Sequence, residues 1–138
     1  MEYTIILTKE AASELLHLKA NDLPCFAAVI ELLRQFRESQ ELVEELLIPH
    51  TDADGDPTFE VKDFERALSN GFNMRILKFY TLQGSLASHR IIYGCHPNAG
   101  KYYVLSIAPR SANYDHNPRW FADVCDRYDN VGIPRIKR

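Results

Sequence analysis

The sequence contains no long hydrophobic run, and no stretch of it is of low complexity. No apolar segment approaches the roughly 20 residues that a membrane-spanning helix needs, which argues against an integral membrane protein. The opening residues, Met-Glu-Tyr-Thr, include neither a basic region nor a long apolar stretch, and so predict no signal peptide. We therefore expect a cytoplasmic protein with no membrane partner.

Cysteine is also scarce. The chain has three, Cys25, Cys95 and Cys125, an odd number spread widely along the sequence. This spacing excludes a disulfide framework and indicates reduced thiols, as in cytosolic proteins. No Cys-x-x-Cys pair or Cys/His spacing predicts a zinc site, and we expect no cofactor.

Charge of one sign is scarce in each half of the chain: basic residues are few in the first half, and acidic residues are few in the second. The 138 residues carry a net charge of −3. Residues 1–70 contain 6 basic and 15 acidic side chains, whereas residues 71–138 contain 10 basic and 4 acidic ones. The basic half is a reason to consider a polyanionic partner such as nucleic acid, although the two halves could equally neutralise each other.

The sequence predicts a clear order of elements, which begins with a strand and two helices. Residues 3–8 are apolar and β-branched and predict a strand, after which Thr8 can cap a helix through about Ala20. Pro24 suits the first turn of a second helix, which we expect to continue until Pro49. The apolar positions expected to face the core are Ala12, Leu15 and Leu16 in the first helix and Phe26, Val29, Ile30, Leu33 and Phe36 in the second.

The second half changes to strands. An acidic connection at about 49–70 ends in a short helix stopped by Gly71, and three strands are expected at 72–82, 88–95 and 101–110. Asn117 and Pro118 then begin a closing helix at about 117–130. This order predicts one α+β domain over residues 1–138, in which a helical hairpin packs on a small antiparallel sheet (β-α-α-β-β-β-α).

The acidic connection includes a stretch that partly matches an EF-hand calcium loop. Counted from Asp52, the acidic positions of the template are occupied by Asp52, Asp54, Asp56 and, at position 12, Asp63. Pro57 takes the place of the required glycine and cannot adopt its positive φ, and Asp63 is shorter than the bidentate glutamate. We favour an acidic connection without a metal, and keep calcium as the alternative.

Two strand motifs carry a resemblance to a known family. "HRIIY" at 89–93 is followed by "YYVLSIAPR" at 102–110. This Arg-x-x-Tyr strand, turn and apolar strand ending in arginine resembles the RelE/ParE superfamily of bacterial toxins, as does the element order over residues 1–47. The resemblance implies a RelE-like fold and a metal-independent endoribonuclease that cuts mRNA in the ribosomal A site and is neutralised by a cognate antitoxin.

The resemblance also implies site residues. Arg90 matches the arginine that contacts the scissile phosphate, and Arg110 matches the one that stabilises the transition state. The preceding strand offers Arg75 and Lys78 for substrate binding. They should point to opposite faces, being three residues apart, and we favour Arg75. Tyr114 and His116 match positions that move a proton in some members, and His116 has the better unperturbed pKa for that task.

Two other functions stay open. A ParE-like toxin that inhibits gyrase shares the fold but generally lacks the basic catalytic cluster. A non-enzymatic binding module would instead use the acidic loop to hold calcium or a basic partner.

Overall fold

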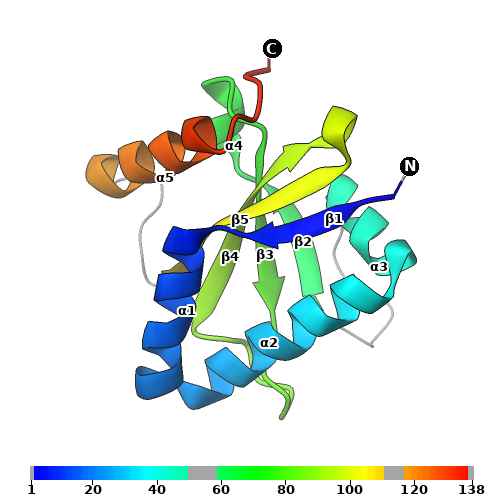
Figure 1. Ribbon diagram of the computed structural model, residues 1–138. Helices are drawn as coiled ribbons and strands as arrows, with labels where there is room; N and C mark the ends of the chain where they lie inside the picture. Colours follow the sequence, from blue (N-terminus) through cyan, green and yellow to red (C-terminus); the bar gives the residue numbers. More distant parts are fainter. Residues whose placement is uncertain (1, 50–58, 111–116, 137–138) are drawn as a thin grey trace.

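A five-stranded sheet forms the centre of the molecule, with strand order β1-β5-β4-β3-β2 (Figure 1). The structure is a computed structural model that describes residues 2–49, 59–110 and 117–136. The strands are β1 (Thr4–Leu7), β2 (Phe59–Asp63), β3 (Met74–Phe79), β4 (His89–His96) and β5 (Lys101–Pro109). Strand β1 runs parallel to β5, and the other neighbours are antiparallel. The α+β class is confirmed, although the parallel edge strand makes the sheet mixed.

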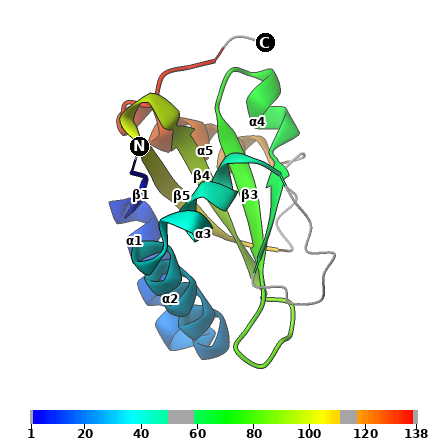
Figure 2. The same ribbon diagram turned by 90° about the vertical axis from the view of Figure 1, so that its right-hand side faces the viewer.

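Helices cover both faces of this sheet. Helices α1 (Lys9–Asn21) and α2 (Leu23–Glu38) lie side by side along one flank (Figure 2) and, with α3 (Gln40–Glu44) and the 3₁₀ turn η1 (Glu45–Leu47), bury one core against it. Helix α5 (Pro118–Asn130) buries a second core on the opposite face. Helix α4 (Glu65–Ser69) and the 3₁₀ turn η2 (Pro97–Ala99) are short connecting elements.

Three of the helix starts follow directly from local sequence chemistry. The side chains of Thr8, Asp22 and Asn117 each accept a hydrogen bond from a first-turn backbone N–H, of Ala11, Cys25 and Trp120 respectively. Such caps satisfy amides that have no partner within the helix. The predicted caps at Thr8 and Asn117 are confirmed, as is the stop of α4 at Gly71, whose φ of 87° suits glycine.

The apolar stripes of the first two helices differ from the prediction by a small rotation. Helix α1 buries Ala11, Leu15 and Leu18, and Leu16 is 66% exposed. In α2 the core positions include Ala28 and Leu32, whereas Ile30 is 45% exposed. Apolar residues adjacent to a stripe cannot be distinguished from its members by spacing alone.

The second helix is also shorter than predicted. It ends at Glu38, and Ser39 caps a new helix by accepting a hydrogen bond from Leu42 N. A serine in a helical pattern can compete for backbone amides and start a separate helix. Within the described residues, we find no helix with both the length and the apolar character that a bilayer crossing requires.

Strand β2 was missed, since residues 59–63 were assigned to the acidic connection. Phe59 and Val61 point into the core, and Glu60 and Lys62 alternate with them on the other face. The alternation is that of a half-buried strand, and β2 pairs antiparallel with β3 at the edge of the sheet. The three strands predicted after Gly71 are confirmed as β3, β4 and β5.

Candidate functional site

The two faces of the sheet are defined by their two cores. The hairpin face carries Leu77 and Ile91 and packs on α1 and α2. The α5 face carries Ile76 and Ile92 and packs on α5. Because side chains alternate along a strand, each candidate can be assigned to a face from its neighbours.

Lys78 and Arg90 lie on the α5 face, close to the end of the sheet at which β3 and β4 are connected. The paired register of the two strands ends at Leu77 and Ile91, and Lys78 and Arg90 are the next residues of β3 and β4. Arg90 is in register with Ala108 of β5. Lys78 and Arg90 are both half-buried.

Arg110 joins this end of the sheet from the third strand. It follows the last residue of β5, and its backbone N–H donates to Ser88 O at 2.7 Å, which extends the β4–β5 ladder by one bond. Its side chain is exposed. We call Lys78, Arg90 and Arg110 the basic cluster.

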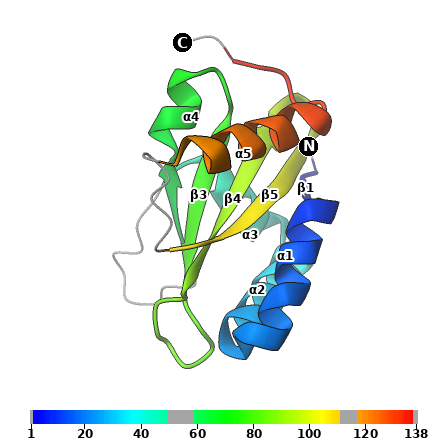
Figure 3. The same ribbon diagram turned by 90° about the vertical axis from the view of Figure 1, so that its left-hand side faces the viewer.

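Among the described elements, helix α5 does not cover this end of the sheet. Figure 3 shows α5 lying across the opposite end, with β3 and β4 running on beyond it. The sheet residues in its core are Met74, Ile76, Ile92 and Leu105. Lys78 lies beyond these positions on β3, so a ligand can approach it without displacing the helix.

The preference for Arg75 over Lys78 is not supported by its position. The two residues do point to opposite faces, as predicted, but Arg75 lies on the hairpin face, away from Arg90. Its guanidinium contacts Asp63 Oδ1 at 3.7 Å, Asn73 Oδ1 at 3.3 Å and Cys95 Sγ at 3.8 Å. Its side chain is 17% exposed, so these contacts make it part of the packing.

The two predicted proton-transfer residues, Tyr114 and His116, lie outside the described residues. The structure adds a carboxylate that sequence reasoning missed. Glu60 of β2 is in register with Lys78, and its Oε2 is 3.4 Å from Lys78 Nζ. The alternation of apolar and charged residues over 59–63 indicates the strand that carries Glu60, but the neighbouring acidic residues obscured it.

The charges of this end of the sheet partly balance. Lys78 and Arg90 are like charges on neighbouring strands, and like charges placed close together in a sheet are destabilising. The carboxylate of Glu60 offsets the charge of Lys78.

The structure argues against the calcium alternative, because the residue at position 12 of the EF-hand template is not placed to bind a calcium ion. Asp52, Asp54 and Asp56 lie outside the described residues, but Asp63 is the last residue of β2, in register with Arg75 and ion-paired to it. An EF-hand would instead begin its exiting helix near this position. The carboxylate that should close the loop is therefore held in the sheet.

A second group of reactive side chains lies on the hairpin face, where α2 and β4 begin. Ligand atoms of Asp22, Cys25 and His89 all lie within 4.8 Å of one another. The Ser88 hydroxyl donates to Asp22 Oδ2 and is 2.8 Å from His89 Nδ1. Sequence spacing could not reveal this group, because His89 is far from the other two along the chain.

The surroundings of this group shift each pKa. The hydrogen bond from Ser88 holds the pKa of Asp22 below its usual value. Burial raises the pKa of the Cys25 thiol and lowers that of His89. These shifts favour the charged form of the Asp22 carboxylate and the neutral forms of the Cys25 thiol and the His89 imidazole.

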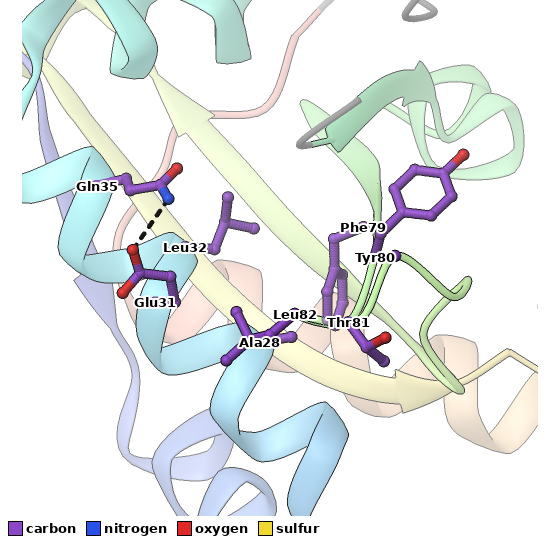
Figure 4. A pocket seen from close by; sticks show the side chains of 9 residues that line it. Ala28, Glu31, Leu32, Gln35, Phe79, Tyr80, Thr81 and Leu82 are labelled. Atoms are coloured by element: carbon purple, nitrogen blue, oxygen red, sulfur yellow. Dashed lines mark hydrogen bonds between the residues drawn. The ribbon is translucent and has the colours of Figure 1, made fainter. Parts of the chain in front are cut away.

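A cavity beside α2 contains none of the predicted site residues. It measures about 440 Å³ and lies between α2 and the connection that follows β3. Figure 4 shows Glu31 and Gln35 of α2 on one side of it, joined by a hydrogen bond of 3.1 Å, and Phe79, Thr81 and Leu82 on the other. Its described lining includes no Lys, Arg or His side chain to bind a phosphate.

Comparison of the chain with protein-family models, with curated proteins and with solved structures gave no match.

Proposed function

We propose that the protein is a toxin-type endoribonuclease, which cleaves mRNA at the ribosome and is held inactive by a cognate antitoxin protein. The observation that carries this proposal is the meeting of Lys78, Arg90 and Arg110 at one end of the sheet. These cations come from three adjacent strands. The resemblance of "HRIIY" and "YYVLSIAPR" to RelE-type toxins supports the same function.

The reaction is the attack of a ribose 2′-OH on the adjacent phosphate, with departure of the 5′-oxygen, and it uses no metal. Negative charge grows on the phosphate oxygens as the attack proceeds, and positioned cations stabilise it. Arg90 contacts the scissile phosphate, Arg110 stabilises the transition state, and Lys78 holds the phosphate from β3. Guanidinium groups on a rigid sheet suit this role because they bind phosphate in a fixed, forked geometry.

A general base must take the 2′-OH proton, and an acid must protonate the leaving oxygen. The resemblance assigns these roles to His116 and Tyr114. Glu60 provides a second candidate base, since its carboxylate lies beside Lys78. A Glu60→Gln variant distinguishes the two assignments, because it should still cleave RNA if His116 and Tyr114 move the protons.

The partners follow from the charge distribution. Residues 1–70 are strongly acidic, so RNA and the ribosome bind through the basic second half. An antitoxin segment that covers the basic cluster with carboxylates would block the phosphate site by charge complementarity.

Cleavage of a reporter mRNA, mapped by primer extension with and without translating ribosomes, tests the proposal. We expect cuts only with ribosomes, and their loss in the variant Arg90→Ala/Arg110→Ala. A matched control, Arg34→Ala/Arg37→Ala, removes the same charge from exposed positions of α2 and should cut normally. Its lost surface ion pairs contribute little to stability.

Undiminished cleavage by the Arg90→Ala/Arg110→Ala variant would overturn the assignment of the site. No cleavage by the unaltered protein, together with inhibition of gyrase, would favour the ParE-like alternative.

A further inference from the structure

Three metal-binding side chains from separate parts of the chain meet on the hairpin face. Asp22 caps α2, Cys25 lies one turn later in the same helix, and His89 is the first residue of β4. Residues three apart lie on the same side of a helix, which explains why Asp22 and Cys25 converge. The sheet then brings His89 to them, so that ligand atoms of all three lie within 4.8 Å of one another.

The chemistry of these donors selects among metals. A thiolate and an imidazole favour borderline-soft ions such as zinc, whereas calcium and magnesium prefer oxygen ligands. With zinc bonds of about 2.0–2.3 Å, the ligand atoms of a tetrahedral site lie about 3.3–3.8 Å apart. The three donors therefore need to close by at most about 1.5 Å to bind one zinc ion.

One of the three residues, His89, also borders a cavity on the hairpin face. The cavity measures about 370 Å³ and is lined by residues of α1 and β5, among them Glu14 and His17. A zinc site with three protein ligands keeps its fourth position for water. Cys25 is only 1% exposed, so the thiol itself is protected from solvent.

We propose that Asp22, Cys25 and His89 bind a zinc ion that fastens the start of α2 to the start of β4. The inference does not depend on the proposed ribonuclease activity, which uses the opposite face of the sheet and no metal. Its consequence for the fold is local: the ion would fix the beginning of the strand from which Arg90 projects. Ser88 holds Asp22 and His89 together when no ion is bound.

Cobalt(II) provides a spectroscopic test in the full-length protein. Co²⁺ bound by a thiolate gives a charge-transfer band in the near ultraviolet that oxygen and nitrogen ligands alone do not give. We expect protein stripped of metal with a chelator to develop this band at one equivalent of Co²⁺, and Zn²⁺ to displace it. Zn²⁺ should also raise the melting temperature, and excess chelator should reverse the rise.

Three variants locate the ion. Cys25→Ser should abolish the band, while Cys125→Ser, the same change at a buried cysteine in the other core, should leave it intact. Asp22→Asn keeps the helix cap and so tests the carboxylate without loss of folding. It should weaken Co²⁺ binding by at least about 100-fold, the upper end of the range of about 10- to 100-fold that loss of an outer-shell partner produces.

The proposal is overturned if the unaltered protein gives no thiolate band, or if the band persists in Cys25→Ser. Equal Co²⁺ affinity of Asp22→Asn and the unaltered protein would also overturn it, and would leave the group a hydrogen-bonded contact between α2 and β4.

Discussion

Two cations of strand β3 have opposite surroundings. The Lys78 side chain lies beside Glu60 and is 29% exposed, whereas the Arg75 side chain is 17% exposed among Asp63, Asn73 and Cys95. Their alternation could be predicted from the sequence, because successive strand residues point to opposite faces. The sequence could not predict which of the two faces packs on the hairpin, because that depends on the register of β3 with its neighbours.

The position of Arg75 leads to a prediction about stability. Arg75→Met should lower the free energy of unfolding by about 1–3 kcal/mol, because Asp63 loses the cation beside it in a half-buried place. Urea titration followed by circular dichroism measures the change. Lys78→Met should have a smaller effect, because Lys78 is 29% exposed against 17% for Arg75, and solvent screens its ion pair with Glu60 more strongly. A larger loss for Lys78→Met than for Arg75→Met would contradict these assignments.

At the scale of elements, helix α5 is fixed to the sheet by a buried tyrosine. Tyr128 OH accepts from Asn73 N at 3.1 Å and donates to Pro134 O at 2.6 Å. The same ring packs edge-on against Phe72. The hydroxyl thus ties α5 to the residue before β3 and to the segment that follows the helix.

Removal of this hydroxyl should loosen α5. Tyr128→Phe leaves a partly buried amide and carbonyl without their partner, and we expect a loss of about 1–3 kcal/mol in unfolding free energy. Tyr103→Phe, on a half-buried tyrosine of β5, is the control and should change stability by less than about 0.5 kcal/mol. Equal effects of the two substitutions in urea titrations would show that the hydroxyl contributes nothing.

The acidic connection and strand β2 lead to a prediction about calcium. Because Asp63 is paired with Arg75 in the sheet, the EF-hand template lacks its closing carboxylate. Millimolar Ca²⁺ should leave the melting temperature unchanged. A rise that a chelator reverses, and that is lost in Asp52→Asn/Asp54→Asn/Asp56→Asn, would restore the calcium alternative.

How far the elements could be predicted depended on local signals. Thr8, Gly71, Asn117 and Pro118 set helix ends through caps and fixed dihedral angles, and those ends were predicted correctly. Strand β2 was missed because its short alternation lies next to a run of carboxylates. The Asp22, Cys25 and His89 group was beyond prediction, because only the packing of α2 on β4 brings it together.

At the scale of the whole molecule, charge is divided between the two halves of the chain. Most acidic residues come before residue 70, and the basic cluster belongs to strands of the second half. If that cluster binds three phosphates, affinity for single-stranded RNA should fall about 20-fold between about 50 and 200 mM salt. Fluorescence anisotropy with a short labelled RNA measures this dependence.

The salt dependence also has an internal control. Arg90→Ala/Arg110→Ala should reduce the slope of log affinity against log salt by about 1.4, which corresponds to two phosphate contacts. Arg34→Ala/Arg37→Ala on α2 should leave the slope unchanged. Equal slopes for the two variants would mean that RNA is attracted by net charge and not by the basic cluster.

The central claim is that RNA is cleaved on the α5 face of the sheet, and the two cations of β3 test it most directly. Single-turnover cleavage of mRNA on programmed ribosomes should be compared for Lys78→Met and Arg75→Met, at a temperature at which both variants are folded. We predict that Lys78→Met slows cleavage at least about tenfold, as expected for loss of a transition-state contact, and that Arg75→Met cleaves at the unaltered rate. Slow cleavage by Arg75→Met with normal cleavage by Lys78→Met would contradict the account and move the site to the hairpin face.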